Sequence, residues 1–201
     1  MQVTIRPDNG KLAFVPTDSD VAWPDLILNQ LDFIWARQAR PRLEGLDDEE
    51  YLWEPVPDCW SLRAVGTGEH AGTMIMDSVR DDESAPDPVT TIAWRMAHVI
   101  VHILKARSYR IFNYAGSNPD DHVFAETAAT ALAQLDNAYL RWKTGVAALT
   151  YQDLAKPIGP DERYFEGQPT AALILHVNRE VLSHIAEIAL LRDLYLRHAN
   201  A

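Results

Sequence analysis

The stretch that decides the fold is PTAALILHVNREVLSHIAEIALLRDLYLR, from Pro169 to Arg197. After its first residue it holds no glycine or proline, and apolar residues recur in it at steps of three and four. These residues are Ile174, Val177, Val181, Ile188 and Leu191. The periodicity predicts a long helix with one face in a hydrophobic core. Pro169 suits its first turn, where a missing N–H leaves no helical hydrogen bond unmade.

Potential metal ligands lie on the same predicted helix. Glu180 and His184 are four residues apart, so their side chains point within about 40° of each other. His184 falls inside the apolar stripe and Glu180 at its margin, and burying such groups is costly unless each finds a partner. A divalent cation held by His184, Glu180 and one histidine from a neighbouring helix would be such a partner. This ligand set suits Zn²⁺ hydrolytic sites and non-haem Fe(II) sites.

Protein partners are the alternative to a metal ion. Glu180 could pair with an arginine such as Arg192, and His184 could be a core histidine with its hydrogen bonds satisfied. Glu187, nearly one turn after His184, could orient that imidazole, act as a base, or be a plain surface carboxylate. His176 lies about 12 Å along the helix axis from His184, so we do not expect both to bind one ion.

Composition and charge limit the classes of function. The chain has 201 residues, of which 47% are hydrophobic and 23% charged, and this predicts one globular domain over residues 1–201. A net charge of −11 disfavours nucleic-acid binding, which normally needs a basic patch. No apolar run reaches the length of about 20 residues that a membrane span needs, and the N-terminus lacks the apolar core of a signal peptide. Cys59 is the one cysteine, so we treat it as a small buried residue and expect a cytoplasmic protein.

Three further long helices follow from the same kind of periodicity. They span about residues 21–39, 90–114 and 125–149, and a short helix begins near Asp47. The expected core residues include Leu26 on the first of these helices and Leu140 on the third.

The segment 51–89 is irregular and rich in proline. Alternation of apolar and polar residues in it permits a small β-hairpin, with Gly66 to Gly68 near the turn. We therefore expect an all-α fold, a four-helix bundle with crossover connections, and this hairpin between helices one and two.

A second pair of histidines lies on the second long helix. His98 and His102 are four residues apart, in line with Arg95 and Lys105, and the rest of the circumference is apolar. This polar stripe is either the solvent-facing side of the helix or one wall of a cleft, because spacing alone does not fix its direction.

Three segments, in order, carry a resemblance to a known family. They read GLDDEEYLWEPVPDCWSLR (45–63), VTTIAWRMAHV (89–99) and HVNREVLSHIAEIALLRDLY (176–195). Together they resemble the DinB/YfiT-like superfamily, especially its actinobacterial DinB_2-type branch, over most of the chain. The resemblance implies a four-helix bundle, often dimeric, that holds a divalent metal ion. Zinc or nickel is the expected metal, with manganese and iron as further candidates.

The resemblance also implies which residues bind the metal. The family takes one histidine from helix two and a His-x3-His pair from helix four. Carried across, these positions are His98, Glu180 and His184. Glu180 departs from the family pattern, and a carboxylate lowers the net charge of the site and favours harder metals.

The chemistry that the resemblance implies involves a cleft beside the metal. The stripe that carries His98 would face this cleft, with His102, Glu187 and Trp60 around it. Related proteins include S-transferases and isomerases that use mycothiol or bacillithiol, in which the metal is thought to lower the pKa of the thiol; activation of water is the other chemistry. We therefore predict a metal-dependent enzyme that acts on a small molecule and forms a homodimer. The alternative is a non-catalytic dimeric bundle, such as a stress-associated ligand-binding protein.

Overall fold

Helices account for most of the protein, whose computed structural model describes residues 22–66, 72–78 and 88–198. The α-helices are α1 (Trp23–Ile34), α2 (Asp48–Leu52), α3 (Ile92–His98), α4 (Ala106–Phe112), α5 (Ala128–Ala147), α6 (Tyr151–Ala155) and α7 (Thr170–His198). Two π-helical stretches, η1 (Trp35–Ala39) and η3 (Val99–Lys105), continue α1 and join α3 to α4. Short 3-10 turns lie at η2 (Pro41–Leu43) and η4 (Pro119–Asp121). The chain is thus mostly helical, as predicted.

The predicted hairpin between the first two long helices is confirmed. Strand β1 (Leu62–Ala64) pairs antiparallel with β2 (Met74–Met76), and Leu62 lies opposite Met76. Gly66 follows β1, whereas Gly68, also expected near the turn, lies outside the described residues.

Side-chain caps set the starts of several helices. Asp47 accepts a hydrogen bond from the N–H of Glu50 at the start of α2, and Thr91 accepts one from the N–H of Trp94 at the start of α3. Thr150 and Asp153 form a reciprocal capping box at the start of α6. The sequence analysis predicted no helix between residues 149 and 169, although this Thr-x-x-Asp pattern is the ordinary signal for a helix start.

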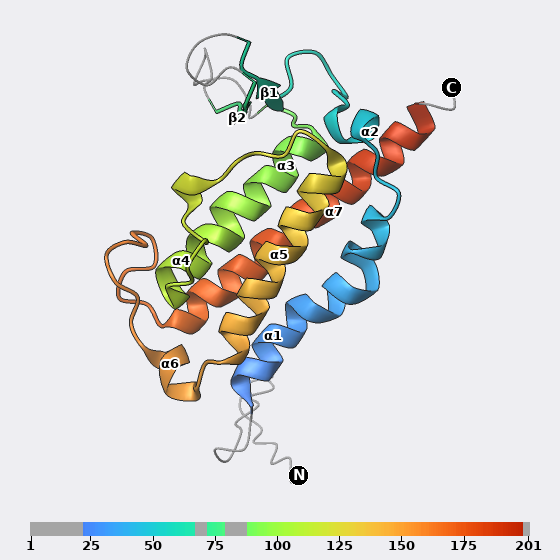
Figure 1. Cartoon of the computed structure of the whole chain (residues 1–201). Coiled ribbons are helices and arrows are strands. Elements are labelled where there is room, and N and C mark those ends of the chain that lie inside the picture. Colours follow the sequence, from blue (N-terminus) through green and yellow to red (C-terminus); the bar gives the residue numbers. More distant parts are fainter. Residues whose placement is uncertain (1–21, 67–71, 79–87, 199–201) are drawn as a thin grey trace, which may run out of the picture.

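The long helical segments lie side by side (Figure 1). The segment α3–η3–α4 packs against both α5 and α7, and α1 packs against the same two helices. Their shared core holds fully buried side chains such as Leu31, Met96, Leu135 and Ile174. The hairpin lies at the end of the molecule where α3 begins, and α6 lies at the opposite end (Figure 1). None of the described helices combines the length and apolar character needed to cross a lipid bilayer.

Two leucines expected in the core are exposed instead. Leu26 on α1 is 55% exposed and Leu140 on α5 is 60% exposed. The face that α1 buries carries Ile27, Leu28 and Leu31. A leucine side chain can lie on the buried or on the exposed side of a helix, so packing against the neighbouring helices determines which leucines are buried.

A buried ion pair joins α2 to the last turns of α7. Arg192 binds both carboxylate oxygens of Glu50, with Nε at 2.7 Å and Nη2 at 2.9 Å. Its remaining nitrogen donates to the carbonyl oxygens of Arg42 and Glu44. The side chains of Glu50 and Arg192 are only 2% and 10% exposed. Such a pair is satisfied only as long as both members are present.

We expect Glu50→Ala to destabilise the protein by about 3–5 kcal/mol, because it leaves the Arg192 charge buried without a partner. The matched control is Asp193→Ala, which removes the exposed ion pair of Asp193 with Arg42 and should cost at most about 1 kcal/mol. Urea unfolding followed by circular dichroism measures both. Equal losses in the two variants would contradict a special role for the buried pair.

Candidate metal centre

His98 on α3 and His184 on α7 lie against each other. Their ring centroids are 4.8 Å apart and the rings are nearly perpendicular, at 84°. The side chain of His184 is 13% exposed. The side of α3 that carries His98 therefore faces α7, and this settles a direction that helical spacing left open.

A carboxylate fixes the orientation of the His184 ring. Nδ1 of His184 lies 2.8 Å from Oε2 of Glu187. A carboxylate only accepts hydrogen bonds, so this shorter contact favours the tautomer with the proton on Nδ1 over the longer contact of that nitrogen with Nη1 of Arg95, at 3.3 Å. Nη1 of Arg95 lies 3.2 Å from the same oxygen and forms an ion pair with the carboxylate. Nε2 of His184 is left with a free lone pair, which is the form of histidine that binds metals.

Glu180 lies between two histidines of its own helix. Its Oε2 is 3.7 Å from Nε2 of His184, and its Oε1 is 3.5 Å from Nδ1 of His176. Two atoms bound to one tetrahedral Zn²⁺ ion lie about 3.4 Å apart, so the Glu180–His184 spacing is close to what a shared ion needs.

The alternative pairing of Glu180 with Arg192 is wrong. Arg192 lies about 18 Å further along the helix axis and binds Glu50 instead.

The environment of His98 keeps its imidazole neutral. Burial, followed by the nearby His184, His102, Arg95 and Arg107, lowers the pKa of His98 to about 3. At neutral pH the ring therefore carries one free lone pair, and no proton has to leave before a metal ion can bind.

Two tryptophans form one wall of the site. Trp94, one turn before His98, stacks on the His98 ring with centroids 5.2 Å apart and planes 7° apart. Trp60 contacts Trp94 in turn, at 5.7 Å. The sequence prediction named Trp60 but missed Trp94, whose four-residue spacing from His98 was the available signal.

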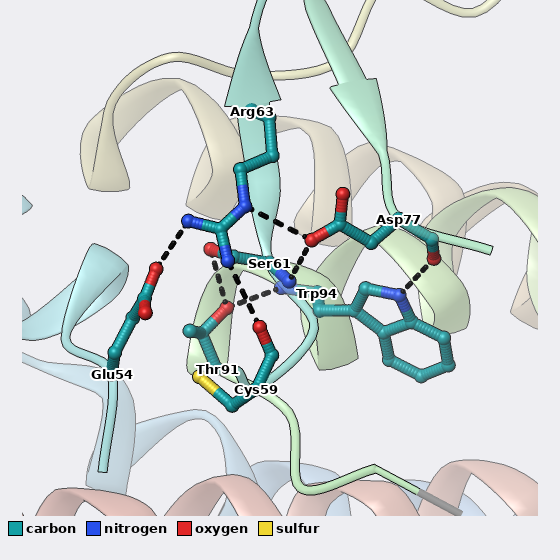
Figure 2. A network of polar contacts seen from close by, with 7 residues as sticks. All are labelled: Glu54, Cys59, Ser61, Arg63, Asp77, Thr91 and Trp94. Carbon is teal, nitrogen blue, oxygen red and sulfur yellow. Dashed lines mark hydrogen bonds and ion pairs between the residues drawn. The ribbon is translucent and has the colours of Figure 1, made fainter. Parts of the chain in front are cut away.

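The hairpin holds Trp94 in place. The indole N–H of Trp94 donates to the backbone oxygen of Asp77, at 2.8 Å. The carboxylate of the same Asp77 accepts from Arg63 Nε at 3.0 Å and from the N–H of Ser61 at 2.9 Å (Figure 2). The position of the ring against His98 thus depends on the residues around β1.

Arg63 is the centre of this network. In Figure 2 its guanidinium reaches Asp77 on one side and Glu54 on the other, and it donates to the backbone oxygen of Cys59. Cys59 itself is buried, as expected. The hydroxyl groups of Ser61 and Thr91 are 3.0 Å apart, which ties the hairpin to the start of α3.

His102 lies near His98 but is exposed, with the two ring centroids 5.5 Å apart. Winding of the backbone explains the difference, because η3 begins directly after His98. In a π-helix each residue bonds five positions back and turns the chain by less than the 100° of an α-helix. The polar stripe that contains His98 and His102 therefore winds around the helix instead of following one straight line.

In the part of the chain that the structure describes, no three His, Cys, Asp or Glu side chains are gathered into a complete ligand set. His98 meets His184, and His184 meets Glu180. Coordination of one ion by all three therefore requires adjustment of these side chains.

The fold and this site define a helical protein with paired histidines between two neighbouring helices. A family comparison matches residues 30–188 to DinB_2, the DinB superfamily. The match covers well over half of the chain, so the protein belongs to the DinB superfamily. Searches of curated proteins and of solved structures give no match.

We expect the metal-free protein to lose stability as the pH falls below about 6.5, the pKa of histidine in the unfolded chain. The pKa of His98 is lower in the folded state, so its contribution is complete above pH 6.5 and is lost as the pH falls toward 3. His98→Phe keeps a ring against Trp94 and removes the titration. Its melting temperature should fall less than that of the wild type between about pH 7 and pH 4.

The control is His198→Phe, at the exposed end of α7, which should keep the wild-type pH dependence. If His98→Phe also follows the wild-type curve, burial of a neutral His98 does not contribute to acid sensitivity.

Proposed function

We propose that this protein is a metal-dependent enzyme that activates a low-molecular-weight thiol, or a water molecule, against a small electrophilic substrate. The proposed metal ligands are His98, Glu180 and His184. One observation carries the proposal: two imidazoles from separate helices meet at 4.8 Å. Beside them lies a carboxylate oxygen 3.7 Å from Nε2 of His184.

The chemistry of the donor set supports a divalent ion. Imidazole suits Zn²⁺ and Ni²⁺, and the carboxylate of Glu180 extends the choice to Mn²⁺ and Fe²⁺. Such an ion would supply Lewis acidity, which lowers the pKa of a bound thiol or water. Glu187 keeps the proton of His184 on Nδ1, and the charge of Arg95 keeps Glu187 in place.

The charges around the site favour a nucleophile in its anionic form. Arg95 and Arg107 act on His98 as positive charges, and nearby positive charge stabilises a thiolate relative to a thiol. Trp94 covers one face of the His98 ring, so a substrate must approach from another side.

The proposal includes three further properties: the arrangement of the helices, the oligomeric state and the location in the cell. The side-by-side packing of α1, α3–η3–α4, α5 and α7 supports the four-helix bundle that the family resemblance implies. We further propose a homodimer and a cytoplasmic location, the latter from the use of one cysteine.

A second candidate function rests on a specific contact. His184, Glu187 and Arg95 already form a closed set of hydrogen bonds and ion pairs. A non-catalytic dimeric bundle, such as a stress-associated ligand-binding protein, would keep these residues as a structural network.

We expect the wild type, stripped with a chelator, to bind one equivalent of Zn²⁺ or Ni²⁺ and to melt at a higher temperature when loaded, because the ion binds only the folded state. His184→Ala should lose this binding. Glu187→Ala, which removes the hydrogen bond that orients His184 and the ion pair with Arg95, should weaken metal affinity by about 10–100-fold. Elemental analysis and calorimetric titration provide the readouts.

The matched control is His176→Ala, on the same helix and on the far side of Glu180, which should keep the metal. Stoichiometric metal in His184→Ala would refute the ligand assignment. No binding of Zn²⁺, Ni²⁺, Mn²⁺ or Fe²⁺ by the wild type would favour the non-catalytic bundle.

We also expect the metal-loaded protein to consume a thiol such as mycothiol in the presence of a model electrophile, and to stop doing so when the metal is removed. Loss of free thiol, followed with a thiol reagent, measures the reaction. Hydrolysis of the electrophile at the same rate without thiol would instead select water as the nucleophile.

A further inference from the structure

A small pocket lies outside the proposed metal centre. It has a volume of about 80 Å³ and lies between η3, α5 and the connector 113–127. Its polar lining residues are Lys105, His122, Gln134, Asn137 and Arg141. None of them belongs to the proposed ligand set, and none is a carboxylate.

His122 presents a hydrogen-bond donor without an acceptor. The ammonium group of Lys105 lies 3.3 Å from Nδ1 of His122. An ammonium group only donates, so Nδ1 accepts and the proton of the neutral ring lies on Nε2. In the described part of the chain, this Nε2 is buried and has no hydrogen-bond partner. A buried N–H left in this state is costly, and His122 is one of the residues that line the pocket.

The two cations of the pocket lack carboxylate partners. Arg141 donates to the side-chain oxygen of Asn137 at 2.9 Å and to the backbone oxygen of Ala115 at 2.7 Å. Among the described residues, neither Arg141 nor Lys105 lies within ion-pair distance of an acid. Elsewhere in the protein, partly buried arginines such as Arg40 and Arg192 do have such a partner.

The pKa shifts of Lys105 and His122 reflect burial and the positive charge of their neighbours. Burial, followed by the charge of Arg141, lowers the pKa of Lys105, although Asp121 opposes this effect. Burial and the charge of Lys105 lower the pKa of His122 to about 4. A smaller part of each pKa shift comes from a neighbouring positive charge, in a chain whose net charge is −11. A bound anion would relieve this repulsion.

We propose that this pocket binds a small tetrahedral oxyanion, either free phosphate or the phosphoryl end of a small metabolite. Lys105 and Arg141 supply donors to it. The amide N–H groups of Asn137 remain available, because its oxygen is already used by Arg141. The volume of about 80 Å³ suits an ion of phosphate size, which displaces a few water molecules.

The test uses the full chain after chelator treatment, at constant ionic strength. Inorganic phosphate should raise the melting temperature with saturation, because it binds the folded state. It should also shift the resonances of His122 in ¹⁵N-histidine-labelled protein. Arg141→Gln should weaken phosphate binding at least tenfold. Arg37→Gln makes the same charge change at an exposed arginine of η1 and should bind phosphate like the wild type.

Lys105→Met is a second variant in case Arg141→Gln does not fold, and it should show the same loss. Phenyl phosphate that binds as tightly as inorganic phosphate would support a phosphoryl end group, and weaker binding would support the free ion. Three results would overturn the proposal: no saturable response, equal responses in Arg141→Gln and Arg37→Gln, or acetate binding as tightly as phosphate. His184→Ala should bind phosphate normally, so the experiment tests the phosphate site independently of the proposed metal centre.

Discussion

Contact between α3 and α7 places His98 beside His184, and the other features of the site follow from that contact. It removes both rings from open solvent, which is why His98 stays neutral in the folded protein. It also brings Arg95 of α3 to Glu187 of α7, so the carboxylate that orients His184 is itself held by the opposite helix. Movement of one helix along the other would break both interactions together.

The hairpin gives this helix pair a fixed third partner. Arg63, Asp77 and Ser61 tie the two short strands to the start of α3 and hold the indole of Trp94. A two-stranded hairpin of this length is marginal on its own in water. Its order therefore depends on the polar contacts around Asp77, and the wall of the site at His98 depends on them too.

The change from α- to π-helical winding after His98 separates two polar sites on one helical segment. His98 faces α7, whereas Lys105 lines a pocket against α5. An ideal α-helix would place residues seven apart on nearly the same side. π-helical turns occur often at functional sites, and here the altered winding lets one segment supply side chains to two neighbours.

The sequence alone determined the long helices, the hairpin and the family, because each depends on local periodicity, turn residues or segment order. It also offered the hydrogen bond of Glu187 to His184 as one of three possible roles for Glu187, because that contact needs only residues on one helix. Only the tertiary structure decided that His98 faces α7, that Arg192 binds Glu50 rather than Glu180, and that Leu26 and Leu140 lie outside the core. These outcomes depend on which helices are neighbours and on local π-helical winding, and spacing along one chain segment contains neither.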